Sequence, residues 1–236
     1  MAIADQLALV QARIAAAAQR SGRDPSSITL VAVSKTFPIE AVREAAAAGQ
    51  RDFGENRVQE ALQKVAQPAD TPLRWHLIGH LQTNKARKAA PAFASIHSVD
   101  SLELLRKLDE GANDRRAGAA PLDLLVQVDL AGEATKFGAP PEEAEQILRA
   151  AGTLAHARIV GLMLVPPWNE DPEQTRPWFV QLRGLRDRLL DDGVPPAALG
   201  QLSMGMSHDY EAAIEEGATI VRVGTAIFGK REAKAP

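Results

Sequence analysis

The feature that most constrains the fold is a repeated alternation between short apolar runs and segments whose apolar residues have helical spacing. Eight runs have strand character: 28–34, 51–54, 73–79, 94–99, 122–129, 157–165, 200–204 and 219–223. Helix-like segments lie between them: 38–48, 55–66, 82–89, 101–112, 140–151, 172–191 and 208–216. Strands that alternate with helices form βαβ units, so the pattern predicts an α/β fold with a parallel sheet.

Eight such strands in a chain of 236 residues predict a closed (β/α)8 TIM barrel, a fold that typically takes about 250 residues. A doubly wound open sheet is the alternative, because periodicity alone does not distinguish it from a closed one. Residues 5–20 carry apolar side chains at helical spacing and predict an extra helix before the first strand. We expect a single barrel domain over residues 1–236, with no room for a second domain after the last strand.

Composition excludes several classes of protein. The chain has no cysteine, which removes thiolate zinc sites, cysteine nucleophiles and disulfide scaffolds. Its 27 basic and 30 acidic residues give no polycationic surface for nucleic acid. No apolar run reaches the 18 residues, roughly, that a membrane span needs. We expect a cytoplasmic protein without nucleic-acid or membrane partners, and, since the helix faces carry mixed charge, a monomer.

In a barrel, chemistry takes place at the carboxyl ends of the strands, so the residues that follow each strand matter most. The first strand leads into Val33-Ser34-Lys35-Thr36. A lysine is usually a solvated surface residue. A lysine at the mouth of a barrel is instead partly desolvated, which lowers the pKa of its amine and allows attack on an aldehyde.

The second and third strands offer weaker signals. Glu55 and Asn56 fit either a helix cap or a ligand contact. His76 and His80 are four residues apart, but Gly79 interrupts any helix between them and no third ligand has motif spacing. We therefore expect hydrogen-bonding or packing histidines and no metal site.

The last two strands carry a stronger combination. Ser207 follows the seventh strand and fits either a helix N-cap or an anion contact. Gly224 and Thr225 follow the eighth strand, where glycine permits close approach of a ligand and threonine supplies a hydroxyl. Barrels frequently bind phosphate between these two loops, so the pair predicts a phosphate site.

Five segments together resemble the pyridoxal phosphate homeostasis protein family. They are VAVSKT at 31–36, DFGENRVQE at 52–60, HLIGHLQTNK at 76–85, SMGMS at 203–207 and VRVGTAIFG at 221–229. The resemblance extends from the first strand to the last. It implies a barrel like the N-terminal domain of alanine racemase that holds pyridoxal 5'-phosphate as a Schiff base.

The resemblance also implies roles for individual residues. Lys35 matches the lysine of the Schiff base, and Asn56 matches a residue that lines the cofactor pocket. Arg222 matches the residue that faces the pyridine nitrogen. The matches to the phosphate cradle are Ser207, Gly224 and Thr225. The positions expected near the cofactor ring are Ser203, Met204, His76 and Met163.

Arg222 bears on catalysis. A guanidinium only donates hydrogen bonds, so it would leave the pyridine nitrogen unprotonated and the ring a poor electron sink; the alternative is an ion pair inside the barrel end. A racemase also needs a second base, and the only tyrosine, Tyr210, follows the phosphate loop, in the wrong place. His76 and His80 remain open for that task.

We therefore expect a carrier or regulator of pyridoxal phosphate without catalytic residues of its own, with PLP-dependent apoenzymes as partners. A PLP-dependent amino-acid racemase is the alternative. A barrel that binds another small phosphate ester is the third possibility.

Overall fold

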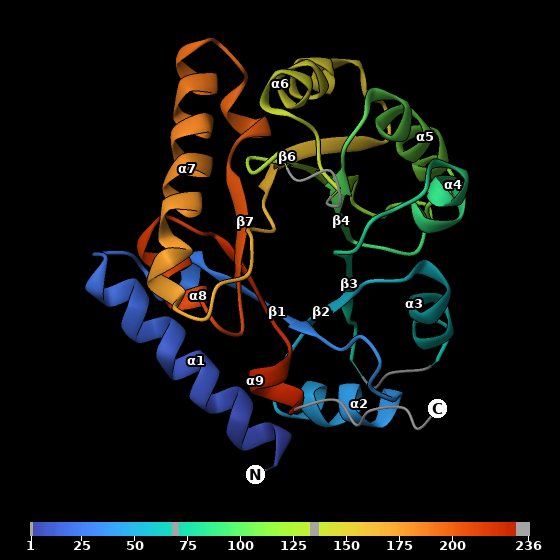
Figure 1. The fold of residues 1–236 in the computed structure, drawn as a ribbon. Helices are drawn as coiled ribbons and strands as arrows, with labels where there is room; N and C mark the ends of the chain where they lie inside the picture. The colour runs from blue at the N-terminus through green and yellow to red at the C-terminus, as the bar shows by residue number, and fades with distance from the viewer. Residues whose placement is uncertain (1, 68–70, 133–136, 230–236) are drawn as a thin grey trace.

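The protein is a closed barrel of eight parallel strands, connected in the order of the chain (Figure 1). The computed structural model describes residues 2–67, 71–132 and 137–229. The strands are β1 (Thr29–Val33), β2 (Asp52–Glu55), β3 (Arg74–Leu77), β4 (Ser95–Val99), β5 (Leu122–Gln127), β6 (Ala157–Met163), β7 (Gln201–Met206) and β8 (Ile220–Val223). The predicted (β/α)8 architecture is confirmed.

The barrel closes because the first strand pairs with the last. Thr29 of β1 lies opposite Ile220 of β8, and Val31 lies opposite Arg222, in parallel register. An open doubly wound sheet would leave these two strands as separate edges, so this alternative is wrong. Closure brings the turn after β1 next to the loop after β8.

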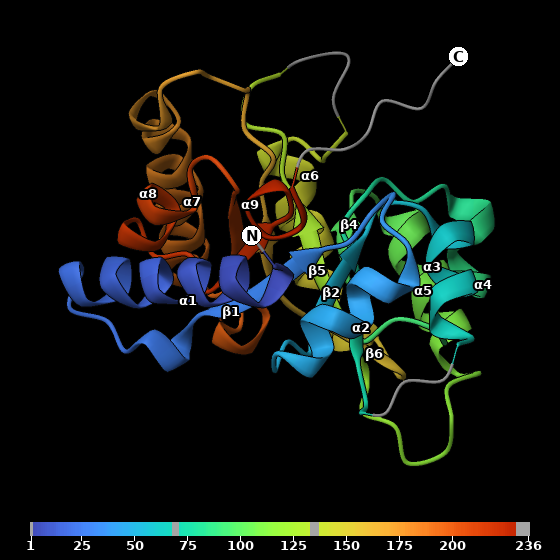
Figure 2. The same ribbon diagram turned by 90° about the horizontal axis from the view of Figure 1, so that it is seen from below.

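Helices surround the barrel, and Figure 2 shows α1 lying along one side of it. They are α1 (Ile3–Arg20), α2 (Ile39–Ala47), α3 (Val58–Val65), α4 (Ala86–Ala89), α5 (Leu102–Ala112), α6 (Pro141–Arg149), α7 (Arg176–Asp191), α8 (Tyr210–Glu215) and α9 (Thr225–Phe228). The sequence predicted all of these except α9, which is a single turn and too short to show a helical period. No helix of the described residues is long and apolar enough to cross a bilayer.

The N-terminal helix is held by an apolar stripe and by ion pairs. Its buried residues follow helical spacing: Leu7, Val10, Ile14, Ala17 and Ala18. Arg20 bridges Glu211 and Glu215 of α8 at 2.9 and 2.8 Å. The helix ends before Gly22, whose φ of 67° suits glycine. Its packing on α8 ties the start of the chain to the last part of the barrel.

The barrel interior has an apolar part and a polar part. Val31, Leu125, Met163 and Ile220 form an apolar cluster separate from the larger core. The larger core fills the space between strands and helices. Such filling by side chains is normal for barrels of this size, which are packed and not open pores. The polar part contains buried side chains that include His76, His97 and Ser203.

Candidate functional site

A cavity of about 360 Å³ opens at the carboxyl ends of the strands. Its lining comes from the segments after β1, β2, β3, β6, β7 and β8, which lie far apart in the sequence. The residues include Lys35, Asn56, Ile78, Trp168, Met206, Ser207, Asp209, Arg222, Gly224 and Thr225. The volume is within the range of about 300–1,000 Å³ that small-molecule sites occupy.

The turn that carries Lys35 is held from both sides by α3. Lys35 itself is half-buried and lines the cavity. Thr36 has a φ of 69°, a left-handed conformation that is unusual for a β-branched residue. The Thr36 amide donates to Glu60 Oε1 at 2.6 Å, and Lys64 Nζ donates to the Ser34 carbonyl at 2.8 Å. These contacts fix the peptide groups on either side of Lys35.

A buried carboxylate completes this support. Glu55 Oε1 accepts hydrogen bonds from Ser34 Oγ at 2.7 Å and from Lys64 Nζ at 2.6 Å. Burial raises the pKa of Glu55, although these two donors oppose the shift. The helix-cap interpretation of Glu55 is wrong, because α3 begins at Val58 and its N-cap position is Arg57. Glu55 instead supports the lysine turn.

Asn56 does not cap the helix either. Its Oδ1 atom is buried and has no hydrogen-bond partner among the described residues. The residue lines the cavity. A buried acceptor without a partner costs free energy, about 1–3 kcal/mol. This atom is therefore well suited to accept a hydrogen bond from a bound molecule.

Ser207 joins the loop after β7 to the loop after β8, which lies next to the Lys35 turn. Its Oγ accepts a hydrogen bond from the Gly224 amide at 3.0 Å. The N-cap position of α8 is Asp209, so the helix-cap interpretation of Ser207 is wrong. A Cβ on residue 224 would lie 3.1 Å from the Val33 carbonyl oxygen, so glycine allows the last strand to approach the first so closely. Thr225 follows at the start of α9.

Arg222 forms part of the cavity wall from inside the barrel. It is 3% exposed, and it donates to Ser203 Oγ at 2.6 Å and to the Leu164 carbonyl at 2.8 Å. Burial lowers the pKa of Arg222 to about 10, with the Asp209 carboxylate opposing the shift. The guanidinium is thus still charged at neutral pH. Its acceptors are a hydroxyl and a carbonyl, and it forms no ion pair within the described part of the chain.

Four of the predicted site residues do not line the cavity. Ser203 lies directly behind Arg222, and His76 is hydrogen-bonded to Asp52 and therefore lies deeper in the barrel. Met163 belongs to the apolar interior cluster. Met204 packs in the outer core, because side chains alternate along β7 and Ser203 points inward.

The two histidines of the third segment make hydrogen bonds and ring contacts. His76 Nε2 lies 2.9 Å from Asp52 Oδ1. His80 Nδ1 lies 3.5 Å from Asp100 Oδ2, and its ring stacks on Phe137 with centroids 3.7 Å apart. In the described ranges, no group of three His, Asp or Glu side chains could hold a metal ion.

Sequence reasoning missed residues at the rim of the cavity. Trp168 is 76% exposed, and its ring stacks on His208 with centroids 6.4 Å apart. His208 Nε2 donates to the Glu170 carbonyl at 2.6 Å. These contacts connect the loop after β6 to the loop after β7. Trp168 itself was the available signal, but no spacing in the sequence relates it to His208, which lies 40 positions further along the chain.

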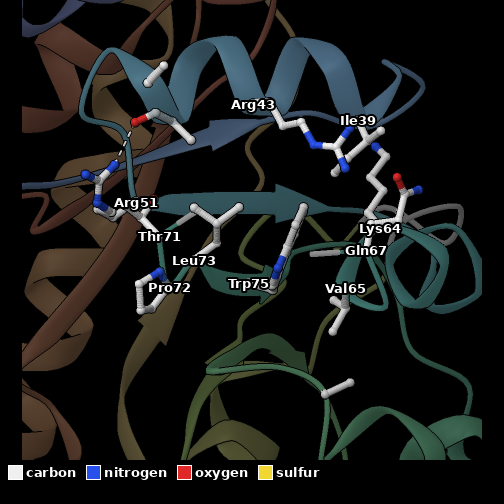
Figure 3. Close-up of a pocket in the computed structure, with 13 residues that line it drawn as sticks. Ile39, Arg43, Arg51, Lys64, Val65, Gln67, Thr71, Pro72, Leu73 and Trp75 are labelled. Carbon is white, nitrogen blue, oxygen red and sulfur yellow. Dashed lines mark hydrogen bonds between the residues drawn. The ribbon is translucent and has the colours of Figure 1, made fainter. Parts of the chain in front are cut away.

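A second cavity, of about 470 Å³, lies on the outer wall between α2 and β3 (Figure 3). Trp75 and Leu73 form part of its apolar lining. Arg51 donates to the carbonyls of Ala46 and Gln50 at 2.7 and 2.9 Å. Lys64, also in its lining, is paired with Glu55. Although larger, this cavity lacks the convergence of strand ends that defines barrel active sites, so we assign the candidate site to the smaller one.

The barrel fold and the cavity at the carboxyl ends of its strands define a class of protein. Residues 6–232 match the family described as "Alanine racemase, N-terminal domain". The crystal structure of alanine racemase from Corynebacterium glutamicum superposes with a TM-score of 0.68 at 16% identity, covering 96% of this chain and 61% of that one. At this identity the likeness concerns the fold alone.

Relatives at higher identity narrow the assignment. The pyridoxal phosphate homeostasis protein of Pseudomonas aeruginosa is 50% identical over 234 residues, 99% of this chain and 98% of the relative. PipY of Synechococcus elongatus, solved with PLP bound, is 43% identical with a TM-score of 0.81, covering 96% of this chain and all of PipY. The chain belongs to the pyridoxal phosphate homeostasis protein family.

Proposed function

We propose that this protein binds pyridoxal 5'-phosphate in the barrel-end cavity and serves as a carrier in the supply of this cofactor. The single observation that carries the proposal is that Lys35 and the Ser207–Gly224 contact line the same cavity. An amine and a set of hydroxyl groups suited to a phosphate, both lining one cavity, suit a ligand with an aldehyde and a phosphate ester. The relative solved with PLP bound supports the same ligand.

The residues present fit the cofactor. A Cβ at position 224 would crowd the Val33 carbonyl oxygen at 3.1 Å, so glycine keeps the loop after β8 close to the Lys35 turn. Ser207 and Thr225 supply hydroxyl groups, and Asn56 has a buried acceptor that lacks a partner among the described residues. Bound pyridoxal phosphate supplies an aldehyde that condenses with the Lys35 amine, releasing one water and forming a reversible Schiff base.

We infer that the protein lacks a robust activity of its own. Arg222 donates hydrogen bonds and does not supply a proton to a pyridine nitrogen, so the ring gains little capacity to hold carbanion electrons. Tyr210 is 1% exposed and packs in the outer core under Arg13 of α1, so it is not a second base for racemisation. His76 lies outside the cavity lining. The proposal covers one barrel domain that acts as a cytoplasmic monomer.

The linkage is tested by reduction with borohydride and mapping of the labelled peptide. We expect the purified protein, saturated with pyridoxal phosphate, to lose its visible absorbance and to carry the pyridoxyl group on Lys35. The K35A variant should carry no such label, whereas K107A, which removes an exposed lysine of α5, should be labelled like the wild type. Equal labelling of K35A would defeat the assignment.

The carrier role is tested against a racemase role with single-enantiomer amino acids in deuterated water. A carrier exchanges the Cα proton slowly and leaves the stereochemistry unchanged. Sustained deuterium uptake with racemisation that depends on Lys35 would establish an enzyme instead. PLP-dependent apoenzymes incubated with the loaded protein then show whether it delivers the cofactor.

A further inference from the structure

A continuous row of buried polar side chains crosses the barrel interior from its amino end to Arg222. We call four of them the relay: Asp52, His76, His97 and Ser203, from β2, β3, β4 and β7. Their exposed fractions are 7%, 7%, 0% and 0%. Arg74 meets the relay at the amino end of β3, and Arg222 meets it at the cavity.

Each neighbour in the row is within hydrogen-bond distance of the next. Asp52 Oδ1 lies 2.9 Å from His76 Nε2, and His76 Nδ1 lies 3.0 Å from His97 Nε2. His97 Nδ1 lies 2.9 Å from Ser203 Oγ, which also accepts the 2.6 Å hydrogen bond from Arg222. The step from β4 to β7 spans the inside of the barrel.

The chemistry of the two ends gives the row one direction. Asp52 accepts two hydrogen bonds from the Arg74 guanidinium, at 2.7 and 2.5 Å, and its pKa is lowered because the hydrogen bonds from His76 and Arg74 outweigh the effect of burial. An ionised carboxylate only accepts, so His76 Nε2 carries the hydrogen.

With one hydrogen on each imidazole ring, the donor and the acceptor of each remaining hydrogen bond follow. His76 Nδ1 then accepts, so His97 Nε2 donates to it and His97 Nδ1 is left as an acceptor. The Ser203 hydroxyl donates to that nitrogen. Burial, together with the positive charge of Arg222, lowers the pKa of His97 well below its ordinary value, in accord with a neutral ring.

We propose that His97, together with His76 and Asp52, is a positioning residue that holds the Ser203 lone pairs toward Arg222 and so fixes the guanidinium at the cofactor pocket. This inference rests on the function proposed above. Because the hydroxyl hydrogen of Ser203 is committed to His97, the oxygen is free to accept from Arg222. The row is a donor-to-acceptor sequence in which every member is satisfied, which a buried polar network requires.

The arrangement has a consequence for the charge of the pocket. The only carboxylate of the relay, Asp52, lies at the far end, where Arg74 pairs with it. Arg222 thus contacts a neutral hydroxyl, and the three N–H groups not used by Ser203 and Leu164 remain for other acceptors. A directly bonded carboxylate would compete with a ligand for those groups.

The direction of the relay is tested first on the cofactor-free protein, with nitrogen-15 NMR of labelled histidine at pH 7. We expect His97 to be neutral, with its hydrogen on Nε2 and none on Nδ1. A hydrogen on Nδ1 of His97, or a charged ring, would overturn the proposal. This measurement does not involve pyridoxal phosphate, so it stands apart from the test of the cofactor assignment.

The effect on the pocket is tested with two substitutions at one position. In H97N the side-chain oxygen can still accept from Ser203, whereas H97F keeps the bulk but offers no acceptor. We expect H97F to weaken pyridoxal phosphate binding about tenfold, the effect of losing one hydrogen bond to a charged group, and to shift the visible band. H97N should restore most of the affinity and the band.

The matched control is S98A, the next residue of β4, which is buried but whose hydroxyl has no partner among the described residues. It should bind and absorb like the wild type. Wild-type affinity and spectrum in H97F would refute the positioning role. If the H97 variants do not fold, the NMR result alone decides. If the wild type binds no pyridoxal phosphate, the proposed function fails, while the NMR result still decides the relay.

Discussion

At the residue scale, the cavity depends on protein contacts that hold the Lys35 turn and the loops after β7 and β8 in place without a ligand. The sequence predicted Lys35, Ser207 and Gly224 because each follows a strand end, where barrel chemistry occurs. It did not predict that Glu60 would hold the lysine turn, because that contact links a helix to a strained backbone position. One glutamate on a helix follows no sequence pattern that would indicate a contact with a distant backbone amide.

The first prediction concerns this support. E60A removes the acceptor of the Thr36 amide, so the left-handed turn at Thr36 loses a partner that stabilises it. We expect affinity for pyridoxal phosphate to fall about tenfold, as for one hydrogen bond to a charged group, measured by absorbance titration. E40A, at an exposed position of α2, is the control. Unchanged affinity in E60A would show that the turn holds without the Glu60 contact.

The second prediction concerns the phosphate side. S207A removes the acceptor of the Gly224 amide and a hydroxyl from the cavity, and T225A removes a hydroxyl from the cavity. Because charge-assisted hydrogen bonds are worth about 1.5–3 kcal/mol, each should reduce cofactor affinity at least tenfold. Thermal unfolding of the cofactor-free protein should change by much less. Equal loss of folding and binding would indicate a purely structural role for these residues.

At the scale of elements, the alternation of strand-like and helix-like segments predicted all eight strands. The signal was clearest where a parallel strand buried on both faces is continuously apolar, as in Leu30-Val31-Ala32-Val33. Helix boundaries were less predictable where polar caps intervene. The segment from 172 was expected to be helical throughout, but Asp171 caps a separate 3₁₀ turn at Pro172–Gln174 and α7 starts at Arg176. Similarly, Glu55 completes β2, so α3 starts later than expected.

The short helix α8 connects α1 to α7 through carboxylates. Glu215 pairs with Arg20 at 2.8 Å, and Glu216 pairs with Arg176 at 2.9 Å and with Arg183 at 2.6 Å. Because Glu216 is the less exposed of the two carboxylates, its pairs are less screened by solvent. The ion pairs thus join the helices before and after β7 to the N-terminal helix.

The third prediction follows from this connection. E216Q keeps the shape of the side chain but removes its charge, and should lower the free energy of unfolding by about 1 kcal/mol, the upper end for partly exposed pairs. The loss should become smaller in high salt, because salt already weakens the pairs in the wild type. Urea unfolding at two salt concentrations measures it, with the exposed E103Q as control. A loss independent of salt would contradict an electrostatic origin.

At the scale of the whole molecule, the polar interior connects residues that no sequence window contains. His97 and Ser203 are 106 positions apart and meet because β4 and β7 face each other across the barrel. His97 itself lies within a fully buried strand, so its sequence context indicated only core. The pattern could therefore predict which strand ends form the site, but not which buried polar groups stand behind it.

The fourth prediction is a pH dependence of stability. The pKa of buried His97 lies well below its ordinary value of 6.5. Below pH 6.5 the unfolded chain therefore gains a proton that the folded protein does not take up. Stability is fully present above this value and falls as the pH decreases, by at most about 1.4 kcal/mol per pH unit for one proton.

Urea unfolding between pH 7.5 and 5 measures this dependence. H97N should show a flatter profile than the wild type because asparagine does not titrate. H156N, at an exposed position, is the control and should keep the wild-type slope. Identical slopes in H97N and the wild type would assign the pH dependence to other groups.

The pairing of β1 with β8 has a further consequence. The turn with Lys35 follows the first strand and the loop with Gly224 follows the last. A molecule that contacts both therefore links the two strands whose pairing closes the barrel. If the chain were divided between β4 and β5, one fragment would contain Lys35 and the other would contain Gly224. Binding of the cofactor would then require that the two fragments associate, and the bound cofactor would slow their dissociation.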